Sequence, residues 1–188
     1  GANGAIANEL VAKSAPDGYT LLLGAAGALT INPAVFASLP FDTLRDFAPV
    51  SLAASSPFSF ALHPAVPANS VRELIALAKS KPGKLTFGTS GTGGAPHLAG
   101  ELFMSMAGVK LVHVPYKGLA PAITDLMGGQ IDISIADVGL VVSQVNAQKL
   151  KAIAVTGLKR SSLLPSVPTV AASGLPGYEA GTWYGVLA

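Results

Sequence analysis

Short apolar runs alternate with amphipathic segments along most of the chain, and this alternation restricts the fold more than any other feature. Apolar runs typical of buried strands occupy residues 19–24, 49–53, 57–63, 85–88, 111–114, 131–136 and 150–156. Segments with helical periodicity lie at residues 6–14, 70–79, 96–107, 118–127 and 140–147. Because strands that alternate with helices are typical of βαβ units, the order predicts an α/β fold with a mainly parallel sheet.

The composition excludes several classes of function. Only 12% of the 188 residues are charged and the net charge is +2, whereas an average soluble protein has about 25% charged residues. The basic residues are scattered, with Lys159 and Arg160 the only adjacent pair, so we expect no binding to nucleic acid. There is no cysteine, which excludes thiol catalysis, disulfides and Cys-type zinc sites.

Metal, membrane and leader signals are also missing from the sequence. The three histidines, His63, His97 and His113, form no spaced pair, and the carboxylates do not cluster, so we expect no metal site. The longest apolar run, residues 21–31, is shorter than the roughly 20 residues of a membrane span. The first residues include no Met and no basic segment, so we expect a chain that begins after processing or is cut from a longer one.

A loop rich in glycine and hydroxyl groups carries the most chemical information. Residues 89–94 join an expected strand to an expected helix, and Pro96 suits the first helical position. Unpaired N–H groups at a helix N-terminus favour an anion, and the hydroxyls of Thr89, Ser90 and Thr92 would add donors. A tight turn that allows close strand–helix packing explains the same residues, and the loop alone supports both interpretations.

This loop does not match the nucleotide-binding or nucleophile motifs. Gly94-Ala95 stands where a P-loop needs Lys-Ser/Thr, and Ala95-Pro96 breaks the dinucleotide-binding pattern. Thr92 stands where a Gly-x-Ser-x-Gly nucleophile elbow needs its last glycine. An α/β hydrolase-like enzyme that uses Ser90, a histidine and Asp137 is the alternative from another functional class.

Two further segments also follow expected strands. Tyr116 offers an apolar wall with a polar tip, and Lys117 can attract an anion. Rim packing also explains Tyr116, and solvated surface is the more common explanation for a lysine such as Lys117 taken alone. Asp137 follows the strand at residues 131–136, and open α/β sheets bind ligands at the carboxyl ends of their strands. The small residues 25–30 are expected to form a loop where backbone approaches a ligand. His113 is expected to be a structural histidine within a strand, and Trp183 either lines a cleft or packs in a core.

The order of the short motifs is more specific than any one of them. In sequence they are Gly1-Ala2-Asn3-Gly4, residues 15–22 (Ala-Pro-Asp-Gly-Tyr-Thr-Leu-Leu), 46–50, 82–85, Ser90-Gly91-Thr92-Gly93, residues 97–103, His113-Val114-Pro115-Tyr116-Lys117-Gly118, residues 129–132, 150–156, 167–170 and Trp183-Tyr184-Gly185. This ordered set closely resembles the Bug (Bordetella uptake) family, the extracytoplasmic solute receptors of tripartite tricarboxylate transporters.

The resemblance implies a type II periplasmic binding protein, in which two α/β lobes close on a ligand. Compared with the family, the chain is expected to be truncated at both ends. The first lobe is expected to comprise residues 1–63 and 155–188 and the second lobe residues 64–154, with residues 64–69 as a stiff connector. The candidate ligand-binding residues are Gly1, Ala2, Gly4, Ala25, Ala26, Thr89, Ser90, Gly91, Gly93, His97, Tyr116, Lys117 and Asp137.

The function that the resemblance implies is capture of a small organic acid in the periplasm, without catalysis and without a cofactor. A dicarboxylate, an amino acid or an aromatic carboxylate would be held by backbone N–H groups, hydroxyls and ordered waters. The partners would be the membrane permease subunits of the transporter. A ligand sensor with the same fold is the second alternative.

Overall fold

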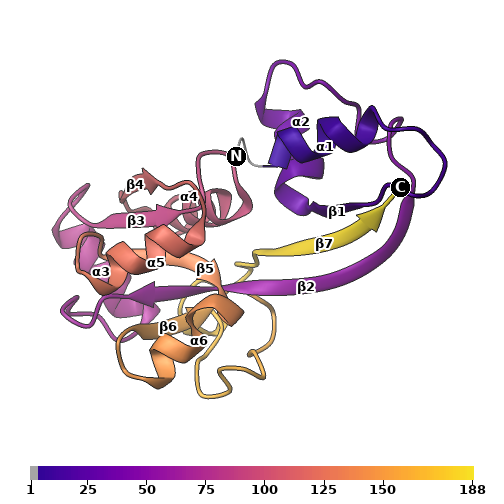
Figure 1. Ribbon diagram of the computed structural model, residues 1–188. Helices are drawn as coiled ribbons and strands as arrows, with labels where there is room; N and C mark the ends of the chain where they lie inside the picture. Colours follow the sequence, from indigo (N-terminus) through magenta and orange to yellow (C-terminus); the bar gives the residue numbers. More distant parts are fainter. Residues whose placement is uncertain (1–3) are drawn as a thin grey trace. The chain divides into compact units, whose positions relative to one another are not determined.

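The computed structural model describes residues 4–188, and its contacts divide the chain into two compact units (Figure 1). Unit 1 extends through Ser56 and also includes Gly93–Ala95 and Thr182–Ala188. Unit 2 comprises Pro57–Thr92 and Pro96–Gly181. The long strand β2 (Pro49–Leu62) begins in unit 1 and ends in unit 2. The sequence predicted two separate strands here, and the structure has one because residues 54–56 continue the extended backbone.

Unit 1 contains helix α1 (Ala5–Ala12), the π-helix η2 (Gly27–Ile31), helix α2 (Asn32–Val35), and the strands β1 (Leu22–Ala25) and β7 (Gly181–Leu187). Strand β1 pairs antiparallel with β7, which neighbours the first part of β2. The core of this unit consists of Leu22, Leu29, Phe41, Phe47 and Leu187.

The prediction of a loop at residues 25–30 is wrong, because the chain becomes helical directly after β1. Ala28 and Leu29 are buried there, and a helix satisfies their backbone hydrogen bonds inside the core. Gly24 allows η2 to pack closely on β1, since a Cβ at that position would lie 2.5 Å from Cδ1 and 3.3 Å from Cγ of Leu29.

Unit 2 is built on a sheet in which β6 (Lys151–Val155), β2, β5 (Ile133–Asp137), β3 (Thr86–Thr89) and β4 (Val112–Pro115) lie in that order. Strand β3 is parallel to β4 and β5, whereas β2 is antiparallel to both β5 and β6. The sheet expected to be mainly parallel is mixed, because β3, β4, β5 and β6 run in one direction and β2 enters between β5 and β6 in the opposite direction.

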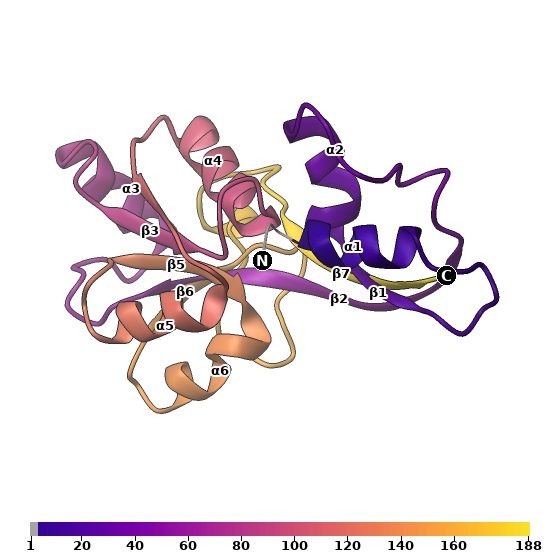
Figure 2. The same cartoon turned by 45° about the horizontal axis from the view of Figure 1, so that its top comes forward.

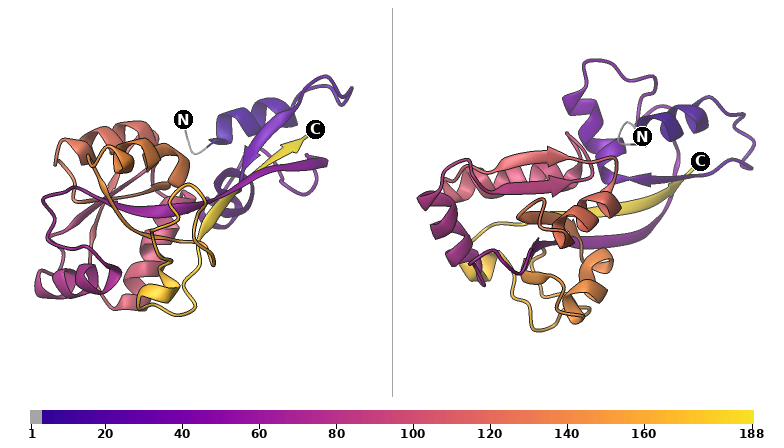
Figure 3. Two further views of the ribbon diagram at one scale, coloured as in Figure 1. Left: turned by 90° about the horizontal axis from the view of Figure 1, so that it is seen from below. Right: turned by 60° about the vertical axis from the view of Figure 1, so that its left-hand side comes forward.

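Helices cover both faces of the unit 2 sheet. Figures 2 and 3 show α5 (Leu119–Met127) and α6 (Val138–Asn146) on one face and α3 (Val71–Ser80) and α4 (Ala95–Ala107) on the other. Side chains alternate between the faces, so Phe60 packs on Phe103 of α4 while the adjacent Ala61 packs in the cluster of α5 and α6. Helix α3 begins as predicted, since Ser70 Oγ accepts a hydrogen bond from the Glu73 N–H.

Residues 155–181 belong to unit 2, whereas the sequence placed them in the first lobe. The backbone N–H of Phe58 donates to the hydroxyl of Thr156, which in turn donates to the carbonyl of Ala180. Tyr178 is fully buried, and its hydroxyl donates to the carbonyl of Ala99 at 2.8 Å. These contacts attach the segment to the core of unit 2, and the short helix η3 (Ala171–Ser173) lies within it.

Candidate functional site

The predicted strand–loop–helix arrangement at residues 89–94 is present. Strand β3 ends at Thr89 and helix α4 begins at Ala95, so the loop leads directly to a helix N-terminus. Gly91 has φ 137° and Gly93 has φ 78°, backbone conformations that residues other than glycine rarely adopt. Glycine at these two positions is therefore required by the backbone of the loop.

The side chain of Thr89 faces the protein interior. Thr89 is fully buried, and its Oγ1 lies 2.6 Å from Nε2 of His113. The same oxygen accepts a hydrogen bond from the Gly91 N–H at 3.3 Å and lies 3.2 Å from the Gly91 carbonyl oxygen. The hydroxyl of Thr89 thus contacts Gly91 of the loop and His113 and is not available to a ligand.

Ser90 differs from its neighbour Thr89. Ser90 is partly buried, and within residues 4–188 no side chain or backbone group forms a hydrogen bond with its hydroxyl. Because a buried or half-buried hydroxyl normally finds a partner, Ser90 has donor and acceptor capacity to offer a ligand. Ser90 is the hydroxyl of this loop best suited to bind a small molecule.

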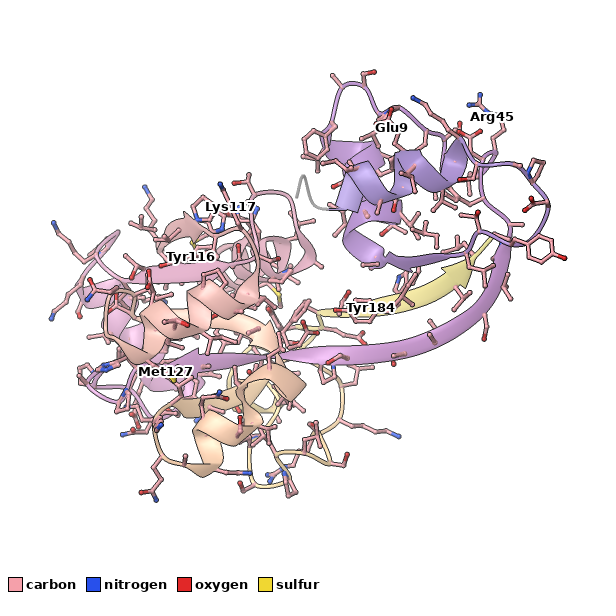
Figure 4. The ribbon with its side chains drawn as sticks, in the orientation of Figure 1. Glu9, Arg45, Tyr116, Lys117, Met127 and Tyr184 are labelled. Carbon is pink, nitrogen blue, oxygen red and sulfur yellow. The ribbon has the colours of Figure 1, made fainter. Side chains whose placement is uncertain are left out.

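Tyr116 and Lys117 follow β4 and precede α5 (Figure 4). The hydroxyl of Tyr116 donates to Oδ2 of Asp125 at 2.8 Å, and burial together with this carboxylate raises the pKa of Tyr116 to about 12. Its ring also packs against Gly88, where a Cβ would lie 3.1 Å from Cε2 of Tyr116. Tyr116 is therefore fixed by the fold, whereas Lys117 is exposed.

Two histidines stack beside the loop on the α4 face of the sheet. The ring centroids of His97 and His113 lie 4.0 Å apart, and Nε2 of His97 lies 3.3 Å from Oε1 of Glu101. Burial, and then the charge of His97, lower the pKa of His113 to about 4. His113 is therefore neutral at pH 7 and is a structural histidine within β4, as its position in the sequence predicted.

Asp137 is the last residue of β5 and directly precedes α6. Because β3, β4 and β5 are parallel, they end at one edge of the sheet, which therefore carries the loop 90–94, the Tyr116–Lys117 segment and Asp137. Asp132 lies at the opposite edge, where its Oδ2 accepts hydrogen bonds from both the N–H and the hydroxyl of Thr86. This topology agrees with the prediction that Asp137, and not Asp132, lies at the carboxyl end of its strand.

The candidate residues of unit 1 lie around the start of η2. Gly4 has φ 87° and precedes α1, and a Cβ on it would lie 3.0 Å from that of Ala28. Ala25 ends β1, and the buried Ala26 precedes η2. Gly1 and Ala2, the other two candidates, lie outside the described residues.

The contact between Thr89 and His113 was not predicted from the sequence. Phe87 and His113 are partners in the parallel register of β3 and β4, and Thr89 lies two residues beyond Phe87 on the same face. The period of two in each strand could have indicated this pair, but only after β3 and β4 were recognised as neighbours.

Other features of the described residues restrict the chemistry. From Gly4 to Ala188, no three His, Asp or Glu side chains come together in a way that could hold a metal ion. No helix in the same range has the length and apolar character needed to cross a membrane. The side-chain amide of Asn8 and the hydroxyl of Thr43 in unit 1 are buried without a hydrogen-bond partner there.

Comparison with known proteins identifies the family. The model of the tripartite tricarboxylate transporter family receptor matches residues 1–188. The chain belongs to this receptor family. The resemblance inferred from the ordered motifs is therefore confirmed.

Solved structures of similar proteins agree with this assignment. Rpa4515 of Rhodopseudomonas palustris, solved with adipate, is 37% identical with a TM-score of 0.96. The periplasmic binding protein BugD is 36% identical with a TM-score of 0.92. MatC of Rhodopseudomonas palustris, solved with bound malate, is 30% identical with a TM-score of 0.90.

All of the chain is covered in each of these three comparisons, but it spans only 63%, 62% and 64% of the respective chains. The fold class predicted from the sequence, an α/β periplasmic binding protein, is confirmed by these likenesses. The mixed sheet with helices on both faces is the form that this fold takes in unit 2.

Proposed function

We propose that this protein is a periplasmic receptor that captures a small organic carboxylate and delivers it to the membrane permease subunits of a tripartite tricarboxylate-type transporter. Membership of the receptor family supports the role, and two similar proteins were solved with the dicarboxylates adipate and malate. The receptor binds without catalysing a reaction and without a cofactor.

The observation that carries the proposal is the chemistry of the loop between β3 and α4. Backbone N–H groups and the positive end of the dipole of the 13-residue helix α4 favour a negative charge there. Ser90 adds a hydroxyl that forms no hydrogen bond with the described protein. Lys117 is exposed after a neighbouring parallel strand and attracts anions toward the same edge of the sheet.

The candidates that follow β3, β4 and β5 have different roles in this proposal. Ser90, Gly91 and Gly93 contribute the loop that binds one carboxylate, and Asp137 at the same edge orients polar groups of the ligand. Thr89 and Tyr116 stabilise the segments that form the site and do not contact the ligand through their hydroxyls, which bond to His113 and Asp125.

The unit 1 candidates for ligand binding stay predictions. Ala25 and Ala26 directly precede η2, and Gly4 lies close to Ala28 in its first turn. Small side chains at these positions allow a ligand to approach the backbone.

The hydrolase alternative receives no support from the geometry. A serine hydrolase needs a histidine within hydrogen-bonding distance of its nucleophile. His113 instead bonds to Thr89, and within the described chain no hydrogen bond joins Ser90 to a histidine. With a pKa of about 4, His113 is also a weak general base at neutral pH.

The test is calorimetric titration of the purified protein with adipate, malate, glutamate and benzoate. At least one carboxylate should bind, and ligand at 100 times its Kd should add about 2.7 kcal/mol to the free energy of unfolding. Binding should survive treatment with EDTA, because no metal takes part.

A matched pair of variants connects binding to the loop. Ser90→Ala should weaken the affinity roughly five- to tenfold, as expected for one lost hydrogen bond to a charged group. Ser105→Ala, on the exposed side of α4, is the control and should leave the affinity unchanged. A folded protein that binds none of these carboxylates, or a Ser90→Ala variant that binds like the control, would contradict the proposal.

A further inference from the structure

The candidate loop is connected to a cluster of three rings through the side chain of Thr89. Phe87 of β3, His113 of β4 and His97 of α4 pack together, with centroid distances of 4.9 Å between Phe87 and His113 and 4.0 Å between the histidines. Phe87 is fully buried, and the side chain of His97 is only 16% exposed. His113 is therefore held in place by ring contacts with both Phe87 and His97.

The contact between His113 and Thr89 transmits this fixed position to the loop. Oγ1 of Thr89 has one proton and two acceptors in reach, Nε2 of His113 at 2.6 Å and the carbonyl oxygen of Gly91 at 3.2 Å. It also accepts the hydrogen bond of the Gly91 N–H at 3.3 Å. Both polar groups of Gly91 thus lie against one hydroxyl, whose orientation depends on His113.

The protonation state of His113 makes it an effective partner for this hydroxyl. Burial and the charge of His97 keep the pKa of His113 near 4, so its ring is neutral at pH 7. Within residues 4–188, the titratable side chains beside it are His97, in direct contact, and Glu101 beyond His97, both on α4. A neutral ring can accept the hydroxyl proton of Thr89, which leaves the lone pairs of that oxygen to the Gly91 N–H.

We propose that His113 is a positioning residue of the carboxylate-binding loop and holds residues 90–94 in their binding shape through the hydroxyl of Thr89. This inference rests on the proposed function of the loop. It assigns a role to a side chain that does not contact the ligand. The advantage is preorganisation, since a loop that is already in its binding conformation loses less entropy when the ligand binds.

Four variants of the protein test this role by their affinity for adipate. His113→Phe keeps an aromatic ring in the stack and removes both ring nitrogens, and Thr89→Val removes only the hydroxyl. Each should weaken binding roughly tenfold, and the double variant should be no weaker than either single one, because both remove the same contact. His113→Gln places an amide near the former Nε2 and should restore affinity to within about twofold of the wild type.

The control is His63→Gln. His63 follows β2 at the opposite edge of the sheet, where its backbone N–H donates to the carbonyl of Asp132. This variant also replaces a histidine in unit 2 but should bind adipate like the wild type.

Hydrogen exchange of the Gly91 amide tests the loop without a ligand. Exchange should be about tenfold faster in His113→Phe and in Thr89→Val than in the wild type, His113→Gln or His63→Gln. This measurement separates the positioning role of His113 from the proposed binding of a carboxylate. If no carboxylate binds but the Gly91 amide behaves as expected, the proposed function fails and the contact to the loop stands.

The positioning role is overturned by either of two results. Folded Thr89→Val that binds adipate like the wild type would show that the hydroxyl does not position the loop. Additive losses in the double variant would show that His113 and Thr89 act separately. If His113→Phe does not fold, the comparison of Thr89→Val with His113→Gln still decides.

Discussion

Gly100, in the middle of α4, provides the sharpest test of how unit 2 packs. A Cβ at this position would lie 2.9 Å from Cζ of Phe87 and 3.1 Å from Cδ1 of Ile135, and closer still to Cε2 of Phe87. Phe87 and Ile135 are both fully buried. Carbon atoms prefer separations of about 3.5–4.0 Å, so Gly100→Ala must displace the buried ring.

Two opposing effects determine the expected magnitude. Alanine is favoured over glycine in a helix interior by about 1 kcal/mol. Overpacking of a well-packed core costs about 1–3 kcal/mol, and the displacement of a ring that also contacts His113 places this case near 3 kcal/mol. Gly100→Ala should therefore lower the free energy of unfolding by about 2 kcal/mol.

Urea unfolding followed by far-ultraviolet circular dichroism measures this change at constant m-value. Trp183, the single tryptophan, lies in β7 of unit 1 and reports that unit separately by fluorescence. The control is Gly139→Ala in α6, where no atom lies within 4 Å of the added Cβ. This control should be neutral or stabilising. A Gly100→Ala protein as stable as the wild type would refute the packing argument.

Three other variants test separate contacts of unit 2. Thr156→Val should lower the free energy of unfolding in urea by about 2–3 kcal/mol, because it leaves the buried N–H of Phe58 without its acceptor. Ser70→Ala should cost about 1 kcal/mol in the same assay through the lost N-cap of α3. The pKa of Tyr116 is raised from 10 to about 12 by burial and by Asp125, so the unfolded chain ionises first as the pH rises. The contribution of Tyr116 to the free energy of unfolding is therefore complete below pH 10 and is lost as the pH rises toward 12. Tyr116→Phe should lose less stability over that pH range, and an identical decline in both proteins would contradict the assignment.

Much of unit 2 could be predicted from the sequence because its signals are local. Ser70 and Glu73 mark the start of α3 through a cap that involves residues three apart. Glycines and hydroxyl residues between an apolar run and Pro96 predicted the loop that joins β3 to α4. The ordered motifs predicted the receptor family, and the family model matches the whole chain.

The direction of β2 and the position of residues 155–181 could not be predicted in this way. An apolar strand buried on both faces reads the same in either direction, so only its partners determine whether a sheet is parallel or mixed. Residues 155–181 join unit 2 through Thr156 and Tyr178, whose partners Phe58 and Ala99 are distant in the chain.

The sequence by itself determined most strands and helices of unit 2, the loop that joins β3 to α4, and the family to which the chain belongs. Only the tertiary structure decided that Thr89 turns inward to His113, while the hydroxyl of Ser90 forms no hydrogen bond with residues 4–188. The physical reason is that the local sequence does not distinguish which of the two neighbouring hydroxyls, that of Thr89 or that of Ser90, faces the interior. Burial against a ring from another strand fixes one of them, and that contact exists only once β3 and β4 are paired.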